Sequence, residues 1–379
     1  MLGDAASKRT AILRLIRTAA AGAIGLAAVG GLAAFAGPAR AAETPGTAGA
    51  VYTMTNSPAG NAIEAYARIG DGSLTPSGTY PTGGTGGALG SGHSIVVSGD
   101  GRVVVNVNAG SNSISAFAAT PQGLHLIGTA SSGGTDPNSV TMAGDGLVYV
   151  LNAGSKTIAG LRLGPGGLRP VPGSAQSLNA EATVPRQIQF SNDGQVLVVD
   201  EGGSSTIDTF VVSPDGTAGP AITTSSAGGG PFGFDFDRAG HLLVSDAALA
   251  TGHSGATSYD VARDGTVTAN GQAVPIDQAA ACWLAAAGDF AYTANAGSGS
   301  IGRYAVAPGG TLTALGSTLV ENNPASHPLD EGVSASQSYL YVLAGGLSQI
   351  VGYRVGHDGS LTQVTAVPVA TGSGGIGAS

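Results

Sequence analysis

Six positions, spaced about one repeat length apart along most of the chain, hold residues of types that can bind or transform a small molecule. They are His93, Asn138, Arg186, Phe232, Cys282, and Asp330 or Glu331. An imidazole such as that of His93 can pass a proton, and a guanidinium such as that of Arg186 can stabilise an oxyanion or hold a carboxylate. These side chains can act together only if the fold gathers them in one place.

Several of these residues also have a purely structural interpretation. His93 could hydrogen-bond a loop carbonyl, and Asp330 and Glu331 in "SHPLDEGVS" could cap a turn instead of adding acidity to a site. Cys282 is the single cysteine and lies in the apolar run "QAAACWLAAAG". We expect it to be a small buried hydrophobic residue, with a reactive thiol as the alternative.

Other catalytic and cofactor chemistries find little support in the sequence. The six histidines are scattered, with no pair at metal-ligand spacing, so we expect no metal site and no cofactor. The sequence contains no G-x-S-x-G nucleophile elbow and no Walker loop. The "GDG" and "PDG" turns lack the ladder of Asp residues that a calcium loop requires.

Three nearly identical phrases reveal an internal repeat. "NAGSNSI" begins at residue 108, "NAGSKTI" at 152 and "NAGSGSI" at 295. Each lies between two apolar, β-rich runs and therefore predicts a hairpin, and seven such hairpins recur at steps of 44 to 53 residues. We expect NAGS to be the hairpin loop, with Asn beginning the turn and Gly taking the positive φ angle.

The segments around the hairpins complete a four-stranded unit. Each hairpin is followed by a Gly-rich turn and a short apolar run, and hairpins two to seven are preceded by a further strand such as "HSIVVSGDG". Seven such units predict an all-β fold, a seven-bladed β-propeller over residues 50–379. The first unit lacks its leading strand, so we expect the C-terminal "VATGSGGIGAS" to supply it and close the ring. This fold would bring the residues at the six positions named first to the central channel.

The first 41 residues differ in character from the rest. A basic start precedes an uncharged apolar run, which ends in the small-x-small sequence "ARA". This pattern predicts a secretory signal peptide over residues 1–41, cleaved after Ala41, and a short linker over residues 42–49. An uncleaved membrane anchor is the alternative, because about 20 apolar residues could span a bilayer.

The charge of the remaining chain limits its partners. Removing residues 1–41 takes away five basic residues and one acidic residue, which leaves ten basic and 23 acidic residues and a net charge near −13. Such a surface repels nucleic acid and anionic membranes, so we expect neither as a partner. We expect a secreted monomer that takes a small-molecule ligand in the central channel.

Three longer phrases resemble the seven-bladed propeller lactonase family. They are "SGDGRVVVNVNAGSNSIS" from residue 98, "PRQIQFSNDGQVLVVDE" from 185 and "AYTANAGSGSI" from 291. The family includes 6-phosphogluconolactonase-like and carboxymuconate-cyclase-like proteins and is related to YVTN-type surface propellers. The resemblance covers residues 50–379 and implies a lactone site at the central opening of the ring.

The resemblance also implies roles for particular residues. Arg186 in "VPRQIQF" falls at the family's Arg position, and Glu201 in "VVDEGG" falls at its Glu position. Glu201 would then activate water, Arg186 would stabilise the oxyanion, and His93 would pass a proton to the leaving oxygen. The residues expected to contact the substrate are Asn138, Gln187, Asp330 and Glu331.

Departures from the family pattern leave two functions open. Two expected histidines are Asn138 and Gln187 here, and an expected basic residue is Phe232, which favours a non-catalytic extracytoplasmic propeller that binds a ligand, glycan or protein. The retained Arg186 and Glu201 favour hydrolysis of a sugar or aromatic-acid lactone, unless they form only a structural ion pair. Catalysis by this pair requires both side chains to open onto one channel pocket, within about 6–7 Å of each other.

Overall fold

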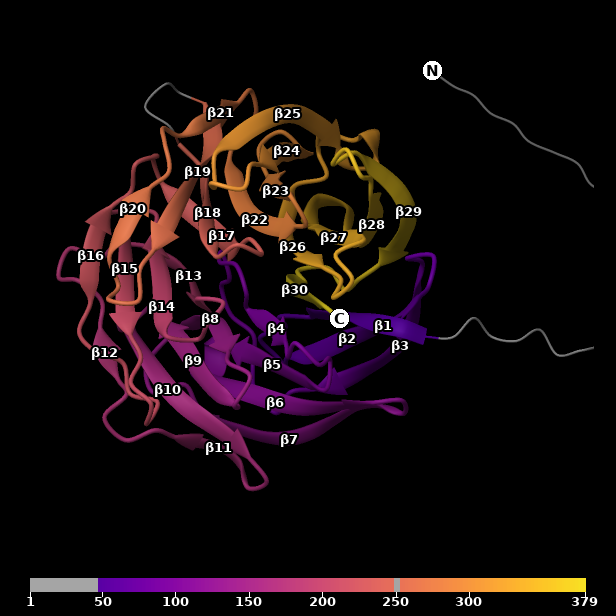
Figure 1. Ribbon diagram of the computed structural model, residues 1–379. Coiled ribbons are helices and arrows are strands. Elements are labelled where there is room, and N and C mark those ends of the chain that lie inside the picture. The colour runs from indigo at the N-terminus through magenta and orange to yellow at the C-terminus, as the bar shows by residue number, and fades with distance from the viewer. Residues whose placement is uncertain (1–46, 249–252) are drawn as a thin grey trace, which may run out of the picture. The chain divides into compact units, whose positions relative to one another are not determined.

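In the computed structural model, which describes residues 47–248 and 253–379, seven antiparallel sheets are arranged around a central axis (Figure 1). Each sheet contains a path of four hydrogen-bonded strands, and two sheets carry a fifth short strand, so the predicted seven-bladed β-propeller is confirmed. The expected signal peptide, residues 1–41, lies outside the described residues. Within the two described ranges, no helix has the length and apolar character needed to cross a membrane.

The blades are numbered along the chain. Blade 1 consists of β30 (Gly374–Ala378) as its inner strand, followed by β1 (Thr47–Met54), β2 (Ala62–Ile69) and β3 (Leu74–Pro81). Blade 2 consists of β4 (Ile95–Val97), β5 (Val103–Asn108), β6 (Ser113–Thr120) and β7 (Gly123–Ser131), with the 3-10 helix η1 (Ala109–Ser111) between β5 and β6. Blade 3 consists of β8 (Pro137–Met142), β9 (Leu147–Asn152), β10 (Thr157–Gly164) and β11 (Gly167–Pro170), with β12 (Gln176–Ser177) also on β10.

The remaining blades follow the same order. Blade 4 consists of β13 (Pro185–Phe190), β14 (Val196–Glu201), β15 (Thr206–Val211) and β16 (Ile222–Ser225). Blade 5 consists of β17 (Pro231–Phe236), β18 (His241–Asp246), β19 (Ser254–Val261) and β20 (Val267–Ala269), with β21 (Val274–Ile276) also on β19. Blade 6 consists of β22 (Ala281–Ala287), β23 (Phe290–Asn295), β24 (Ser300–Val306) and β25 (Leu312–Leu319). Blade 7 consists of β26 (Pro328–Val333), β27 (Tyr339–Ala344), β28 (Gln349–Val355) and β29 (Leu361–Pro368), with η2 (Val320–Asn322) and η3 (Gly345–Leu347) in its loops.

The two ends of the chain close the ring together. β30 pairs antiparallel with β1, with Tyr52 opposite Gly377 and Thr53 opposite Ile376. The Arg68 guanidinium also donates to the carbonyl oxygen of Ser379, from Nε at 3.2 Å and Nη2 at 3.0 Å. The predicted closure by the C-terminal strand is therefore confirmed, and it leaves no inner edge of blade 1 unpaired.

The second strand of each blade explains why the apolar runs are nearly continuous. Every residue of β9, β14 and β27 is buried, because neighbouring blades pack against both faces of these strands. Tyr149, Tyr292 and Tyr341 occupy equivalent places in three of these second strands. Their hydroxyls donate to carbonyls in the outer turn of the following blade, at 2.8, 3.1 and 2.8 Å. These bonds tie successive blades together around the ring.

The hairpin loops correct one detail of the sequence interpretation. The positive φ angles lie at Asn112, Lys156 and Gly299, at 51°, 53° and 64°, and not at the glycine of NAGS. That glycine is required by close approach, because a Cβ atom at Gly110 would lie 2.2 Å from the carbonyl oxygen of Gly86. Its N–H donates at 3.1 Å to a carbonyl of the segment that leads into the same blade. The conserved-looking phrase therefore anchors each hairpin to its connecting segment.

The ring has two faces, which we name by their connections. The hairpin face carries the loops between the second and third strands, and the inner strands begin there. The turn face carries the turns between the first and second strands, and the inner strands end there. These names are used below to locate the channel residues.

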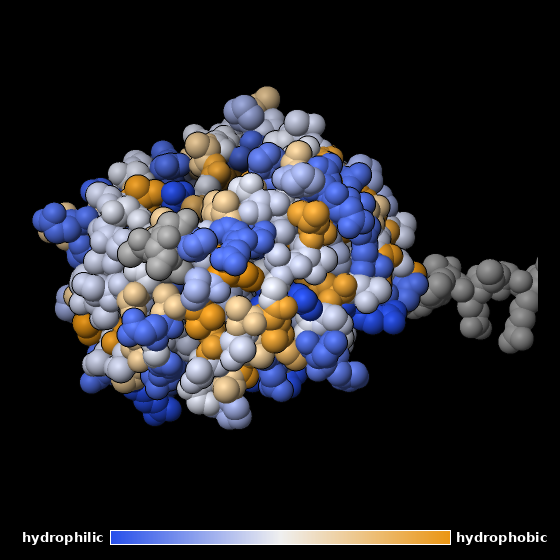
Figure 2. Space-filling view, turned by 90° about the horizontal axis from the view of Figure 1, so that it is seen from above, coloured by the Kyte–Doolittle hydropathy of each residue, from blue (hydrophilic) through white to orange (hydrophobic). Residues whose placement is uncertain are grey.

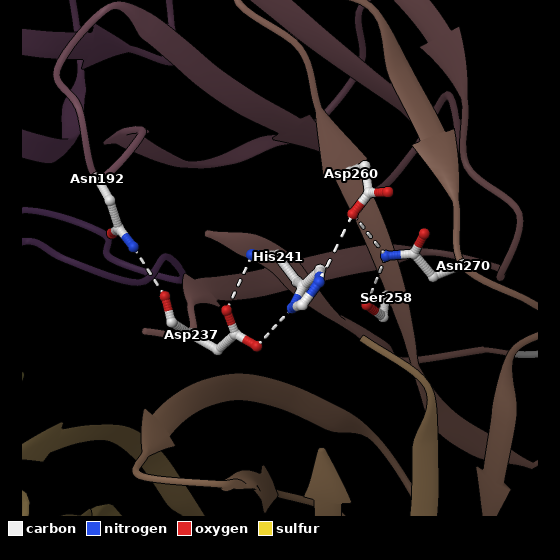
Figure 3. A network of polar contacts seen from close by, with 6 residues as sticks. All are labelled: Asn192, Asp237, His241, Ser258, Asp260 and Asn270. Carbon is white, nitrogen blue, oxygen red and sulfur yellow. Dashed lines mark hydrogen bonds and ion pairs between the residues drawn. The ribbon is translucent and has the colours of Figure 1, made fainter. Parts of the chain in front are cut away.

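A polar network fixes the turn of blade 5 on the turn face (Figure 3). Asp237 Oδ2 lies 2.7 Å from Nδ1 of His241, and its Oδ1 accepts the His241 backbone N–H at 2.9 Å. His241 Nε2 lies 3.8 Å from Asp260, which accepts a hydrogen bond from Asn270. Asn192 of blade 4 donates to the carbonyl of Asp237 at 2.7 Å. The imidazole therefore connects β17 to β19, while Asn192 connects the turn to the neighbouring blade.

Candidate active site in the central channel

The inner strands begin with β-bulges, and the bulged residues are those that the repeat placed at the channel mouth. The pairing register of the first two strands shifts at Asn138, Arg186, Cys282 and around Phe232. A bulge adds one residue without a partner and turns its side chain away from the regular alternation. In blade 7 the bulge falls at Leu329, so Asp330 and Glu331 occupy the regular strand positions that follow it.

The bulged residues of blades 3, 4 and 5 each contact the start of the inner strand of the next blade. Asn138 donates to the carbonyl of Pro185 at 2.9 Å. The Arg186 guanidinium lies over the Phe232 ring at 4.2 Å, and the Phe232 ring meets the edge of Trp283 at a centroid distance of 4.9 Å. Burial lowers the pKa of Arg186. The structure therefore brings Asn138, Arg186 and Phe232 together, as a belt of contacts around the hairpin face of the channel.

A short segment of the chain itself occupies the middle of this belt. We call residues 90–92 the mouth segment. Arg186 Nη1 donates to the carbonyl of Gly90 at 2.7 Å, and Trp283 Nε1 donates to the carbonyl of Ser91 at 3.0 Å. The Ser91 hydroxyl in turn donates to the carbonyl of Asn138 at 2.6 Å. The donors expected to meet a substrate at the mouth therefore bind the protein's own backbone.

Glu201 lies elsewhere, within the hairpin of blade 4. Its fully buried carboxyl accepts hydrogen bonds from Ser204 at 2.8 Å, Thr206 at 3.0 Å and Asn179 at 3.0 Å. Burial and the neighbouring Asp208 carboxyl raise the pKa of Glu201 to about 7. Its contacts in the described part of the chain join it to this hairpin and not to the channel.

The expected pair of Glu201 and Arg186 is therefore not assembled. No hydrogen bond or ion pair within the described ranges connects these two side chains, and neither lines the cavity inside the channel. The register explains the separation, because Glu201 pairs with Pro185 at the end of β14 while the bulge turns Arg186 in another direction. Catalysis by this pair has no geometric support.

The channel holds a cavity of about 190 Å³ on the side of the turn face. Its lining comes from the inner strands of blades 1, 2, 5, 6 and 7, and consists of His93, Ile95, Val96, Val97, Asp235, Ala285, Glu331, Gly332, Val333, Ile376, Gly377 and Ala378. The ionisable groups among these are His93, Asp235 and Glu331. Small residues at Ala285, Gly332 and Gly377 leave the space.

Glu331 is the most exceptional of these groups. Its side chain is buried, with 4% of the residue exposed, and neither carboxyl oxygen has a hydrogen-bond partner. Burial, together with the nearby Asp330, raises the pKa of Glu331 well above its usual range. A raised pKa favours the protonated form, which can donate a hydrogen bond into the cavity, while the backbone N–H groups of Ala285 and Ala294 oppose the rise.

Asp330 has a different role from its neighbour. Its Oδ1 accepts the N–H of Glu331 at 2.9 Å, and its Oδ2 accepts the N–H of Ile376 in the closing strand at 3.1 Å. Burial raises the pKa of Asp330 to about 8. Asp330 thus connects blade 7 to the strand that completes blade 1, and it lies behind the cavity lining.

Asp235 supplies a carboxylate surrounded by donors. Its Oδ1 accepts hydrogen bonds from Gln189 at 2.9 Å and from the Phe236 N–H at 2.8 Å, and its Oδ2 accepts from the Ala286 N–H at 3.0 Å. Such donors stabilise an anion. Asp235 was not predicted from the sequence. In "FGFDF" the buried Phe234 and Phe236 lie on one face of the strand, and Asp235 between them lies on the opposite face. An inward-facing charge on an inner strand was the available signal.

Gln187 positions His93 at the inner end of the cavity. Gln187 is held by the backbone of Phe234, donating to its carbonyl and accepting its N–H. Its amide nitrogen lies 3.3 Å from His93 Nδ1. The same amide nitrogen donates to Phe234 and lies 3.2 Å from Gln189 Oε1, so its contact with His93 is a hydrogen bond only in the tautomer that carries the ring hydrogen on Nε2. Burial lowers the pKa of His93, which keeps it neutral, while Asp235 opposes this effect.

The described residues contain no group of three or more His, Cys, Asp or Glu side chains that could hold a metal ion. Cys282 is buried beside Trp283, and burial raises the pKa of its thiol to about 11. A thiol with a raised pKa is a poor nucleophile, which favours the packing role.

A seven-bladed propeller with an ionisable pocket in its channel is the class of protein that these features define. The family model "Lactonase, 7-bladed beta-propeller" matches residues 51–176 and 237–375, and the chain belongs to this family. The unmatched stretch, residues 177–236, contains Arg186, Gln187, Glu201 and Asp235. Membership therefore assigns no role to these four residues.

Solved structures share the fold. A Bacteroides fragilis protein provisionally assigned as a 6-phosphogluconolactonase is 21% identical, with a TM-score of 0.71 over 87% of this chain and 98% of its own. The periplasmic gluconolactonase of Pseudomonas aeruginosa is 17% identical, with a TM-score of 0.68 over 86% and 99% of the respective chains. No curated protein sequence matches the chain significantly. At these identities the likeness concerns the fold alone.

Proposed function

We propose that this protein hydrolyses a lactone in its central channel, using Asp235, Glu331 and His93. The observation that carries the proposal is the buried Glu331 carboxyl, which faces the cavity without any hydrogen-bond partner. Buried polar groups are almost always paired, so an unpaired one in a cavity indicates a ligand. Membership of the lactonase family and the carboxylate of Asp235 in the same cavity add support.

The reaction follows from the protonation of these groups. Asp235 accepts a proton from a water molecule, whose oxygen attacks the lactone carbonyl carbon. The N–H at Nε2 of His93 donates to the oxyanion that forms on the carbonyl oxygen. The ring C–O bond then breaks, and Glu331 gives its proton to the leaving oxygen. The product is the open hydroxy acid, and the proton held by Asp235 returns to Glu331 through solvent.

The test is hydrolysis of neutral sugar, acyl and aromatic lactones by the purified protein. Glu331→Gln and Asp235→Asn preserve side-chain volume, and we expect each to lower kcat at least 100-fold, or about 3 kcal/mol, without loss of folding. Glu201→Gln is the matched control, and we expect it to remain within threefold of the unmodified protein. Full activity in Glu331→Gln would contradict the proposed role.

A non-catalytic binding propeller is the second candidate. It is favoured by the belt at the mouth, in which Arg186, Trp283 and Asn138 bind the mouth segment. Absence of hydrolysis on every lactone of the panel would favour this candidate. The next measurement would then be a search for compounds that raise the Tm of the protein and lose this effect in Glu331→Gln.

We further propose that the protein is exported and acts as a monomer. The basic start, apolar run and "ARA" sequence of residues 1–41 support export, and sequencing the N-terminus of secreted protein should give Ala42 first. Hydrophilic and hydrophobic residues are interspersed on the face shown in Figure 2. Among residues 47–248 and 253–379, the exposed large hydrophobic residues are Leu126, Val184, Ile222, Leu315 and Leu319. They belong to three blades, and light scattering should report the mass of one chain.

A further inference from the structure

The connection that leads into blade 2 is longer than its counterparts. The connection between β7 and β8 consists of residues 132–136, and the one between β16 and β17 consists of residues 226–230. The connection between β3 and β4 is longer and consists of residues 82–94. β4 itself has three residues, while β8, β13, β17 and β26 each have six. The chain therefore has extra length before blade 2, and the mouth segment is part of it.

The mouth segment crosses the centre of the ring. Gly90 accepts a hydrogen bond from Arg186 in blade 4, and Ser91 donates to Asn138 in blade 3. Ser91 also accepts from Trp283 in blade 6, which lies on the far side of the ring from blade 2. Figure 1 shows the chain before β4 reaching toward the inner strands β13 and β17. Contacts with three blades close the channel at its hairpin face.

The cavity opens in the other direction. Its lining includes Val97, Val333 and Ala378, which are the last residues of β4, β26 and β30. Since inner strands end at the turn face, the cavity extends toward that face. His93, which directly follows the mouth segment, forms the closed end of the cavity. His93 adopts the left-handed backbone conformation, with a φ angle of 54°.

We infer that the channel is a blind pocket that takes its ligand from the turn face, with the mouth segment as its permanent floor. The identity of the ligand rests on the proposed function. The path by which a ligand enters the pocket does not depend on it. The ionisable lining consists of Asp235, Glu331 and His93, with no lysine or arginine, so the pocket suits a compact, uncharged lactone. Arg186, Asn138 and Trp283 hydrogen-bond to the mouth segment from outside, and none of them lines the cavity.

The test blocks each face separately. Val333→Phe adds bulk at the turn-face end of the cavity, and Val97→Phe repeats the block from another strand if the first variant fails to fold. Trp283→Phe removes the hydrogen bond to Ser91 while keeping an aromatic ring. We expect either rim variant to lower kcat/KM for a neutral lactone at least tenfold, and Trp283→Phe to change it less than threefold.

A second readout does not depend on activity. A water-soluble carbodiimide with glycinamide, applied to the folded protein at pH 5, should label the protonated Glu331, and mass spectrometry locates the label. We expect the rim variants to reduce this labelling at least fivefold and Trp283→Phe to leave it unchanged. Labelling that is absent in the unmodified protein, insensitive to the rim variants, or increased by Trp283→Phe would overturn the inference. Rim-dependent labelling without lactone hydrolysis would support the route while contradicting the proposed reaction.

Discussion

Replacing Glu201 by Gln tests whether this residue is catalytic or structural. Burial and Asp208 raise its pKa from 4.5 to about 7 in the folded protein. A carboxyl whose pKa is raised by folding contributes stability that is fully present below the unfolded pKa and is lost as the pH rises through the folded pKa. The unmodified protein should therefore lose stability between about pH 4.5 and pH 7 through this group.

The magnitude follows from the two pKa values. One pKa unit corresponds to about 1.4 kcal/mol, so the change from 4.5 to about 7 costs about 3 kcal/mol at pH 8 relative to pH 4. Gln resembles the protonated acid, because its amide oxygen accepts from Ser204 and Thr206 as Oε2 does, while its NH2 group replaces Oε1 beside Asp208 and Asn179. We expect Glu201→Gln to match the unmodified protein at pH 4 and to exceed its free energy of unfolding by up to about 3 kcal/mol at pH 8.

Urea unfolding at pH 4 and pH 8, followed by circular dichroism, measures both values, with lactone hydrolysis assayed beside it. Glu181→Gln is the matched control, since Glu181 is exposed in the segment leading into the same blade and should show no such pH dependence. An equal loss of stability at both pH values would refute the reasoning about protonation. A folded Glu201→Gln variant with 100-fold lower activity would restore the catalytic role implied by the family resemblance.

Three further predictions concern other parts of the ring. Burial raises the pKa of Asp246 to about 7, so Asp246→Asn should gain up to about 4 kcal/mol relative to the unmodified protein between pH 4 and pH 8, measured by urea unfolding. His241→Ala removes the contact with Asp237 at 2.7 Å and should lower the free energy of unfolding at pH 7 by about 2 kcal/mol; a change below about 0.5 kcal/mol would show that the network in Figure 3 is dispensable. Gly110→Ala places a Cβ atom 2.2 Å from a carbonyl oxygen and should lower the free energy of unfolding by about 2 kcal/mol. In the control Gly99→Ala the new Cβ meets no atom within 4 Å, and the free energy of unfolding should change by less than about 0.5 kcal/mol. Equal effects of the two variants in thermal unfolding would contradict the steric argument.

Much of the fold can be read from the sequence because its signals are local. Alternating apolar runs, Gly-rich turns and the period of the NAGS phrases specify strands and hairpins within single blades, and seven copies then have few ways to bury their faces other than a ring. The missing strand before β1 and the surplus strand at the C-terminus also indicated the closure. These are patterns of residues close together in the chain, and their physical basis is the two-residue alternation of a strand.

The candidate site depends on the directions in which side chains point, and the spacing of the sequence repeat does not specify these directions. Repeat spacing identified Asn138 and Arg186 as equivalent residues, but their β-bulges direct the Asn138 side chain to the Pro185 carbonyl and the Arg186 guanidinium to Gly90 and the Phe232 ring. Glu201 has the residue type of a general base, yet its place opposite Pro185 directs it into a buried hairpin. The extra length of residues 82–94 was visible in the sequence, but its path across the ring was not.

The sequence by itself determined the propeller, the number of its blades, its closure and the family, because each follows from local pattern or repeated phrases. Only the tertiary structure decided that Asp235 of blade 5, Glu331 of blade 7 and His93 of blade 2 line one cavity, since inner strands far apart in the chain converge on the axis. It also decided that the Glu331 carboxyl is buried without a hydrogen-bond partner and has a raised pKa, while Asp235 is surrounded by donors. Burial and hydrogen bonding make the Glu331 and Asp235 carboxyl groups different, and both effects arise from residues that folding brings together.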